Sequence, residues 1–389
     1  MPTDQPYTAA PTRICLVAHF AFGALSGRPG HIGGVERQTS LMARWLAARG
    51  HHVTLITWDE GQPDGVVVDG VRVLKVCARD EGLPGLRFLH PRWTSLVQAL
   101  SRADADVYYQ NCGEYVTGQV ALWCRSRGKP FTYSVASDPD CDPALPLMKT
   151  RRERTLYRYG VKHADRIVVQ THHQAQLLRD GFGVPATVIP MPCPDHDLGP
   201  LPVPVASDRR FGRVLWIGRI CAVKRPDRLL ETAARCPDLQ FDLVGPPEEG
   251  EYAQDIVRRA ALLPNVTVHG PASRETVPAF YRGASCLLCT SDIEGFPNTF
   301  LEAWSHGVPV VSTIDPDRII AARGLGAAVT DGDFATPLRA LTAHSPDWID
   351  MGRRARVYYE ANHTVDAVMR QFERLFVDAA RRRVTARAA

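Results

Sequence analysis

The sequence predicts an α/β protein of two domains, each built on a doubly wound parallel sheet. Apolar runs typical of buried parallel strands alternate with helical stretches from residue 13 to about residue 190. The proline-dense segment PMPCPDHDLGPLPVP, at 190–204, is typical of a semi-rigid linker. The alternation then starts again at residue 213. We therefore expect a polar tail at 1–12, domains at 13–195 and 205–362, and a final helix at 363–389.

Composition limits the class of protein. The chain has 389 residues, 45% hydrophobic and 23% charged, which suits about two globular domains. A net charge of +4 is too small to favour nucleic acid as a partner. No stretch approaches the roughly 20 apolar residues of a membrane span, and the N-terminus lacks the apolar core of a signal peptide. We therefore expect a cytoplasmic protein.

The ten cysteines are scattered, mostly within apolar runs. Only Cys286 and Cys289 have a spacing that resembles metal ligands, and residues three apart on a strand point to opposite faces. We therefore expect reduced, mainly buried thiols and no structural zinc.

In the first domain, apolar runs predict seven strands, and periodic stretches between them predict helices. The strands are expected at 13–20, 52–58, 66–76, 106–110, 130–136, 166–170 and 187–190. The helices are expected at 35–49, 94–102, 115–127, 147–161 and through 177, with a glycine-rich loop at 20–34. Gly33 and Gly34 stand just before a helix, where bare backbone N–H groups attract an anion; a flexible turn is the alternative.

The second domain repeats the pattern. Strands are expected at 213–217, 240–244, 266–269, 284–289 and 308–313. Helices are expected at 227–235, 252–262, from 277, at 298–306, and as one amphipathic tail over 348–383.

The stretch from Ser291 to Thr313 carries the strongest functional signal. A strand leads into the turn Glu294-Gly295-Phe296-Pro297, which is followed by a helix from Asn298. Gly295 allows close approach of a ligand, and Pro297 sets the start of a helix whose free N–H groups attract an anion. Glu294 and Glu302 can each accept hydrogen bonds from neighbouring hydroxyls, which suits a ligand with phosphates and many OH groups. The alternative is a turn residue and a helix-surface acid.

The run E294-GFPNTFL-E302-AWSHGVPVV resembles the E-x7-E signature of the family-four retaining glycosyltransferases of GT-B fold. Gly218-Arg219, with Lys224 five residues further on, resembles the G-R-x4-K loop of that family, and GGVERQ its N-terminal glycine pair. The resemblance implies two Rossmann-like domains facing across a cleft, with the last helix crossing back to the first domain. It also implies that Arg219 and Lys224 hold the diphosphate, Glu294 the sugar and Glu302 the ribose. Further donor contacts are then expected at Gly33, Gly34, Gly218, Gly245, Gly295, Phe296, Pro297 and Asn298.

Ser137 and Asp138 follow a strand at the place where many members of that family have a histidine that touches the sugar. We expect these two residues at the acceptor or sugar site, although the departure puts the role of that histidine in doubt. Asp138 and Asp140 also have the Asp-x-Asp spacing of a metal site, which we discount because Pro139 stiffens the pair.

The resemblance implies a retaining, metal-independent glycosyltransferase that forms an α-linkage. Its donor is expected to be a UDP-sugar, with a GDP-sugar next, and its acceptor a glycan, a lipid-linked glycan or a small molecule. The alternatives are a nucleotide-sugar 2-epimerase of the same fold and a non-catalytic scaffold that binds nucleotide-sugars. Both remain open from the sequence.

Four basic residues at spacings of three and four form a stripe on one predicted helix: Arg151, Arg154, Arg158 and Lys162. A solvated helix face is one interpretation. The other is a surface for anionic lipid at the inner face of a membrane or for a phosphate-bearing acceptor.

Overall fold

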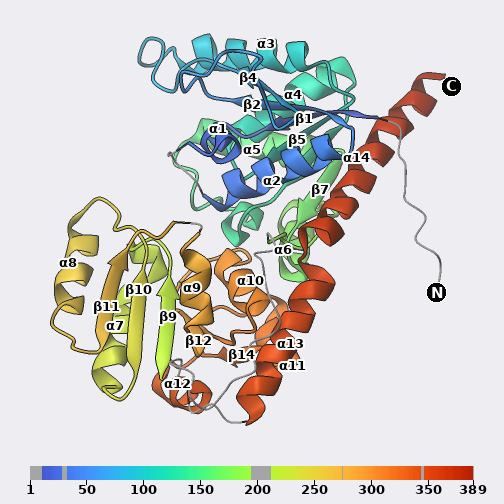
Figure 1. Cartoon of the computed structure of the whole chain (residues 1–389). Helices are drawn as coiled ribbons and strands as arrows, with labels where there is room; N and C mark the ends of the chain where they lie inside the picture. Colours follow the sequence, from blue (N-terminus) through green and yellow to red (C-terminus); the bar gives the residue numbers. More distant parts are fainter. Residues whose placement is uncertain (1–10, 29–32, 194–211, 274, 343–345, 389) are drawn as a thin grey trace, which may run out of the picture. The chain divides into compact units, whose positions relative to one another are not determined.

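The computed structural model describes residues 11–28, 33–193, 212–273, 275–342 and 346–388 (Figure 1). Residues 1–10 of the predicted tail and 194–204 of the predicted linker lie outside the described residues. The chain forms two compact units. Unit 1 comprises Met1–Pro190 together with Val368–Ala389, and unit 2 comprises Met191–Ala367. Both contain a mainly or wholly parallel sheet, so the predicted α/β class is confirmed.

Among the described residues, the sheet of unit 1 has eight strands in the order β3-β4-β2-β1-β5-β6-β7-β8. Neighbouring strands are parallel, as in the pairing of Arg13 with His52, except that β3 runs antiparallel to β4. The strands are β1 (Arg13–Val17), β2 (His52–Thr57), β3 (Val67–Val68), β4 (Val71–Lys75), β5 (Val107–Asn111), β6 (Phe131–Ser134), β7 (Arg166–Val169) and β8 (Thr187–Val188). The chain leaves β1 toward β2 on one side and reaches β5 on the other, so β1 and β5 flank the point where the strand order reverses.

The helices of unit 1 largely follow the predicted ranges. They are α2 (Gly34–Ala48), α3 (Thr94–Ala103), α4 (Tyr115–Arg127), α5 (Arg151–His163) and α6 (His172–Phe182), with a π-helical segment at Phe88–Trp93. The prediction of a loop throughout 20–34 is wrong, because Ala21–Ser26 form helix α1. Its run AFGAL is buried, and Ser40 of α2 donates a hydrogen bond to the carbonyl of Ala21 at 3.2 Å. Burial of the apolar side chains outweighs the weak helix propensity of Gly23.

In the described part of unit 2, the sheet has six parallel strands in the order β11-β10-β9-β12-β13-β14. They are β9 (Arg213–Ile217), β10 (Gln240–Val244), β11 (Val266–Gly270), β12 (Cys286–Cys289), β13 (Val310–Ser312) and β14 (Gly326–Ala328). The helices are α7 (Pro226–Arg235), α8 (Glu251–Ala260), α9 (Val277–Arg282), α10 (Asn298–Ser305), α11 (Ile319–Arg323), α12 (Ala335–Thr342) and α13 (Pro346–Asn362).

Successive residues of the strands in unit 2 pack into two different cores, as expected for a sheet covered on both faces. Trp216 and Cys286 belong to a core shared with α7, α8 and α12, whereas Leu215 and Cys289 belong to a core shared with α10 and α13. Cys286 and Cys289 therefore do lie on opposite faces. All ten cysteines are free thiols, and all but Cys112 are buried, as predicted.

The tail is not the single helix that its apolar spacing predicts. It breaks at residues 363–364 into α13 and α14 (Val365–Ala388). At the break, the carbonyl of His363 accepts a hydrogen bond from Cys193 N at 3.0 Å, and Tyr359 Oη donates to the carbonyl of Cys193 at 3.1 Å. These contacts join the start of unit 2 to its end, and a helical period in the sequence cannot reveal them.

Helix α14 returns to unit 1, as the predicted fold class requires. Phe372 and Phe376 lie with their ring centroids 6.0 Å and 5.5 Å from the ring of Tyr109 on β5. Buried Glu373 accepts hydrogen bonds from Arg49 at 2.8 Å and pairs with His51 at 3.0 Å. Apolar and charged contacts therefore both attach the last helix to this unit.

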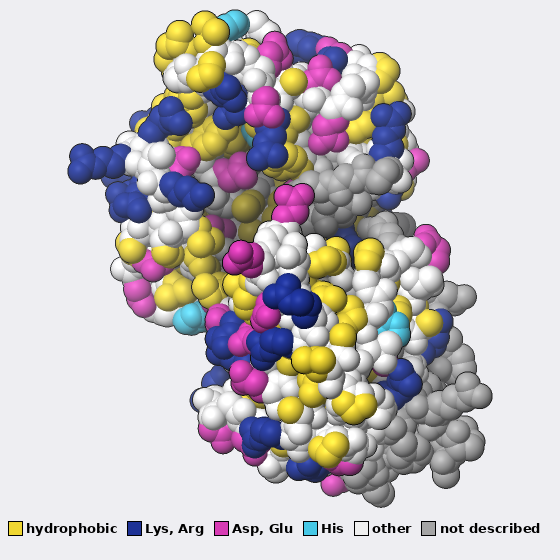
Figure 2. Space-filling model, turned by 90° about the vertical axis from the view of Figure 1, so that its left-hand side faces the viewer, with side chains coloured by type: hydrophobic (Ala, Val, Ile, Leu, Met, Phe, Trp, Pro, Cys, Tyr) yellow, Lys and Arg dark blue, Asp and Glu magenta, His cyan; other side chains and the backbone are white. Residues whose placement is uncertain are grey.

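The surface carries mixed charge. On the face shown in Figure 2, Lys and Arg side chains are interspersed with Asp and Glu, in keeping with the small net charge. None of the helices in the described part of the chain is long and apolar enough to span a membrane.

Candidate functional site

The switch point of the sheet in unit 2 lies between β9 and β12. The chain leaves β9 toward β10 on one side, while β12 pairs with β9 on the other. Ligands of open α/β sheets bind outside the carboxyl ends of the strands at such a point. The loop after β9 contains Gly218–Arg225, and the loop after β12 contains Thr290–Pro297. Most of the predicted donor residues therefore lie at this one edge.

Lys224 and Glu294, from these two loops, form an ion pair between Nζ and Oε1. Ser291 Oγ donates a hydrogen bond to the same carboxylate oxygen at 2.7 Å. The side chains are 29% and 14% exposed, so the pair is partly withdrawn from solvent but still accessible. The structure thus brings together a predicted diphosphate ligand and a predicted sugar ligand; their roles remain predictions.

Two glycines lie at the ends of neighbouring strands at this edge of the sheet. Gly245, after β10, has φ +140°, and a Cβ added there would lie 1.8 Å from the carbonyl oxygen of Gly218 after β9. Gly218 N donates to Val244 O at 3.0 Å, and Gly245 N donates to Gly270 O at 2.8 Å. Only glycine fits at 245, because any side chain would separate the ends of two neighbouring strands.

In the turn before α10, the side chain of Phe296 and the backbone have different surroundings. Gly295 is half-buried, and Pro297, at φ −66°, is the N-cap of α10, whose first residue is Asn298. The ring of Phe296 does not face solvent: it is 5% exposed and packs against Trp304 and His363, at centroid distances of 6.1 Å and 5.2 Å. Phe296 therefore holds the turn against the core, and only its backbone is left for a ligand.

The other two predicted side chains of the donor site have partners of their own. Arg219 pairs with Glu248 at 3.2 Å, and both side chains are about half exposed. Glu302 Oε2 accepts a hydrogen bond from Tyr281 Oη on α9 at 2.6 Å. Neither Glu248 nor Tyr281 carries a signal in the sequence that would have singled it out.

In unit 1, the predicted anion site at the start of α2 receives a carboxylate from the chain itself. Gly33 N donates a hydrogen bond to Oε2 of Glu36 at 2.9 Å, and a Cβ at Gly33 would lie 2.6 Å from that oxygen. The expectation of a bare N–H at Gly33 is therefore wrong for this state. Gly34 is the first residue of the helix.

The two aspartates after β6 have separate partners. Asp138 Oδ1 accepts a hydrogen bond from Gln174 Nε2 on α6 at 3.0 Å. Buried Asp140 accepts from the backbone N–H groups of Gly113 and Ser137, both at 3.3 Å, which ties the loop after β5 to the loop after β6. The acceptor or sugar role of Ser137 and Asp138 remains a prediction. Among the described residues, no group of His, Cys, Asp and Glu is arranged to hold a metal ion.

The basic stripe lies on α5, and two of its members support a loop. Arg154 Nε donates to Met148 O at 3.0 Å, and Arg158 Nη2 donates to Pro143 O at 2.8 Å. Arg151 and Lys162 are exposed. Part of the stripe therefore has a structural role, and contact with a membrane remains a prediction.

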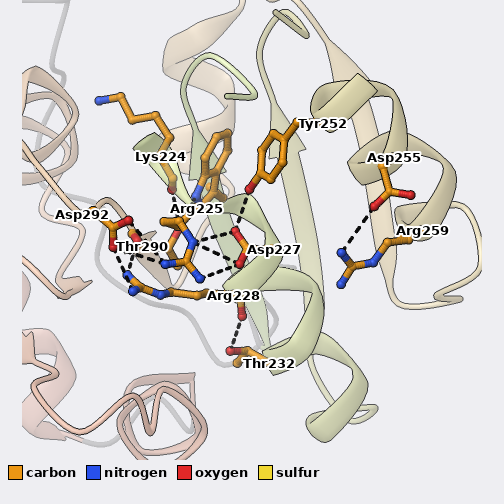
Figure 3. Close-up of polar contacts among 11 residues, drawn as sticks. Lys224, Arg225, Asp227, Arg228, Thr232, Tyr252, Asp255, Arg259, Thr290 and Asp292 are labelled. Carbon is orange, nitrogen blue, oxygen red and sulfur yellow. Dashed lines mark hydrogen bonds and ion pairs between the residues drawn. The ribbon is translucent and has the colours of Figure 1, made fainter. Parts of the chain in front are cut away.

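Sequence reasoning missed a network of charges directly beside Lys224 (Figure 3). It consists of Arg225, Asp227, Arg228, Tyr252 and Asp292, joined to one another by hydrogen bonds and ion pairs. The sequence shows only that Arg225 follows Lys224 and that Asp292 stands two residues before Glu294, and charged residues are common in loops.

The fold is shared with solved glycosyltransferases. Sucrose-phosphate synthase from Thermosynechococcus elongatus superposes with a TM-score of 0.74 at 20% identity, covering 93% of this chain and 98% of that one. Anabaena Alr3699/HepE, solved in complex with UDP and glucose, superposes with a TM-score of 0.73 at 16% identity, covering 94% and 99%. The two sheets thus define the GT-B fold class.

The sequence comparison is more specific. Residues 33–194 match the Glycosyl transferase 4-like domain, and residues 212–343 match the Glycosyl transferases group 1 family. The D-inositol 3-phosphate glycosyltransferase of Mycolicibacterium vanbaalenii is 28% identical over 95% of this chain and 91% of its own length. The enzyme of that name from Nocardiopsis dassonvillei is 28% identical over 87% and 85%. The chain therefore belongs to the group 1 glycosyltransferases and depends on a nucleotide-sugar.

Proposed function

We propose that this protein is a retaining glycosyltransferase that moves a sugar from a UDP-sugar to an acceptor hydroxyl and forms an α-linkage. The observation that carries the proposal is the pairing of Lys224 with Glu294 at the switch point of unit 2. UDP is the first donor nucleotide to test because the HepE protein of similar fold was solved with UDP bound.

The chemistry requires charge stabilisation more than a catalytic base. A departing nucleoside diphosphate develops negative charge, which Lys224 and Arg219 can stabilise in place of a metal ion. In the structure, Glu294 pairs with Lys224. When the donor binds, its diphosphate replaces Glu294 as the partner of Lys224, and sugar hydroxyls donate hydrogen bonds to the released carboxylate. Glu302, oriented by Tyr281, is then available to the ribose.

The acceptor belongs to unit 1 in this proposal, with Ser137 and Asp138 as candidate contacts. The relatives reported above are named for D-inositol 3-phosphate, a small polyol that carries a phosphate. We therefore propose a hydroxyl-rich acceptor and choose D-inositol 3-phosphate as the first compound to test. Carboxylate and hydroxyl side chains suit recognition of sugar-like OH groups.

The proposal is tested by measuring product formation from UDP-sugars with and without acceptor. We expect Lys224→Ala and Glu294→Ala each to lower turnover by at least about tenfold, roughly 1.4 kcal/mol of transition-state stabilisation. Arg353→Ala is the control, because Arg353 pairs with Asp350 on an exposed surface of α13. Near-normal turnover in both site variants would refute the assignment. Donor converted without acceptor would instead indicate the epimerase, and donor binding without any turnover would indicate the scaffold.

A further inference from the structure

Arg225, the residue after Lys224, has a backbone conformation that arginine rarely adopts. Its φ and ψ are +50° and +49°, in the left-handed region. This region is unfavourable for a residue with a Cβ and almost without cost for glycine. Such a conformation persists only where surrounding contacts compensate for it. The interactions of the Arg225 side chain provide that compensation.

The guanidinium of Arg225 connects two segments. It donates to Asp227, at the start of α7, with distances of 3.0 Å from Nε to Oδ1 and 2.7 Å from Nη2 to Oδ2. Its Nη1 lies 3.4 Å from both carboxylate oxygens of Asp292, in the loop after β12. Tyr252 on α8 fixes Asp227 by donating a hydrogen bond to its Oδ1 at 2.7 Å. The fork of the guanidinium thus joins the loop of Lys224 to the loop of Glu294.

A second arginine completes the connection. Arg228 Nη2 lies 2.8 Å from Asp292 Oδ1, and Arg228 Nη1 donates to Thr290 O at 2.9 Å. The backbone N–H of Asp292 donates to Val223 O at 3.0 Å. Single exposed ion pairs contribute little, but a network with fixed geometry contributes more. Asp292 is therefore held by three groups, two residues before Glu294.

The backbone of Lys224 is held by the network, whereas its side chain pairs with Glu294. Thr290 Oγ1 donates to Lys224 O at 2.8 Å and accepts from Trp216 Nε1 at 2.9 Å. Thr290 and Trp216 are both buried. In Figure 3 the Lys224 side chain extends away from the ion pairs of Arg225 and Asp227. The network therefore fixes the backbone of Lys224, and its charged side chains do not pair with the Lys224 ammonium group.

We propose that Arg225 is a positioning residue, which places Lys224 and Glu294 for catalysis by tying the loop of one to the loop of the other through Asp292. The inference rests on the proposed function, in which those two residues contact the donor. Arg225 itself acts through its neighbours and not on the substrate.

Arg225→Gly tests this directly, because glycine accepts the left-handed backbone while the side chain that joins Asp227 to Asp292 is lost. We expect kcat to fall about tenfold, with the KM for acceptor and the melting temperature close to those of the wild type. Asp292→Asn should lower kcat similarly. The kcat of the double variant should be only slightly lower than that of either single variant, since both substitutions break the same connection between Arg225 and Asp292. Arg225→Lys should restore part of the rate.

The matched control is Arg259→Gln, because Arg259 pairs with Asp255 within α8 (Figure 3) and does not join the network. We expect its kcat to be that of the wild type. Wild-type kcat in Arg225→Gly, or fully additive losses in the double variant, would overturn the positioning role while Lys224→Ala still lowers turnover. If Lys224→Ala also has normal turnover, the proposed function itself is wrong.

Discussion

At the scale of single residues, two glycines of unit 2 have nearly the same backbone angle and different surroundings. Gly245 has φ +140° and Gly250 has φ +134°. A Cβ at Gly245 would lie 1.8 Å from Gly218 O, whereas a Cβ at Gly250 would meet no atom within 4 Å. The first glycine is needed for both its conformation and its contact, and the second only for its conformation.

We expect Gly245→Ala to destabilise unit 2 by several kcal/mol, since overpacking against fixed backbone adds to the strain of the positive φ. Gly250→Ala should cost only about 1–2 kcal/mol, from the strain alone. Urea unfolding of both variants measures the difference. Equal losses would show that the contact with Gly218 can relax freely.

The residues of the site could be predicted from the sequence only in part, because the sequence shows spacing along the chain and not contacts in space. Lys224 and Glu294 could be predicted because each stands at a fixed spacing within a recognisable loop. The sequence did not reveal the roles of Arg225, Asp292 and Tyr281, because their contacts depend on which segments meet in three dimensions. Burial of the Phe296 ring also needed the structure, since its partners are the distant Trp304 and His363.

At the scale of elements, one buried histidine, His363, lies at the break between α13 and α14. His363 is 1% exposed, and its Nδ1 lies 2.8 Å from Met191 O, to which it donates as N–H. Burial lowers the pKa of His363 to about 4, although the hydrogen bond to Met191 acts in the opposite direction. The side chain is therefore neutral in the folded protein at neutral pH.

Because the folded pKa lies below the unfolded value of about 6.5, this group stabilises the fold fully above about pH 6.5. The contribution decreases as the pH falls toward 4, by at most about 1.4 kcal/mol per pH unit. We expect His363→Gln to be less stable than the wild type at pH 7.5 and to show a shallower loss between pH 6.5 and 4. Denaturant unfolding across that range measures both slopes. Parallel curves would contradict the prediction.

Helix and strand bounds could be predicted from the apolar runs wherever burial alone determines them. Strands β9 and β10 and helix α4 begin and end at the predicted residues, because each strand is an apolar run and the helix ends at Gly128, in the left-handed conformation. The apolar spacing did not show the break at His363, because α13 and α14 continue a similar helical period; a final helix from residue 363 was expected only from the domain division. The break is set by the bond from Cys193, far away in the sequence.

At the scale of the whole molecule, unit 1 is discontinuous in sequence and unit 2 is continuous. Unit 1 consists of the first 190 residues and of the segment from Val368 onward. The second segment supplies Phe372 and Phe376, both buried, to the face of the sheet that carries Tyr109. The loops of Lys224 and Glu294, by contrast, both lie within unit 2.

Ending the chain after Ala367 should therefore destabilise unit 1 by at least about 3 kcal/mol, because two buried phenylalanines are lost. Calorimetry should show an earlier transition for unit 1, while UDP still raises the transition of unit 2. Ending the chain after Arg382 is the control, because both phenylalanines and Glu373 are kept. Loss of the UDP effect together with α14 would show that the units are not independent.

The return of α14 to unit 1 also affects the order in which the two units can complete their folds during synthesis. A ribosome releases α14 only after every residue of unit 2 has been made, so Tyr109 lacks the packing of Phe372 and Phe376 throughout that time. Domains made first usually fold first. Here unit 2 has its full set of residues first, although its translation starts later, and unit 1 can complete its fold only after α14 has been made.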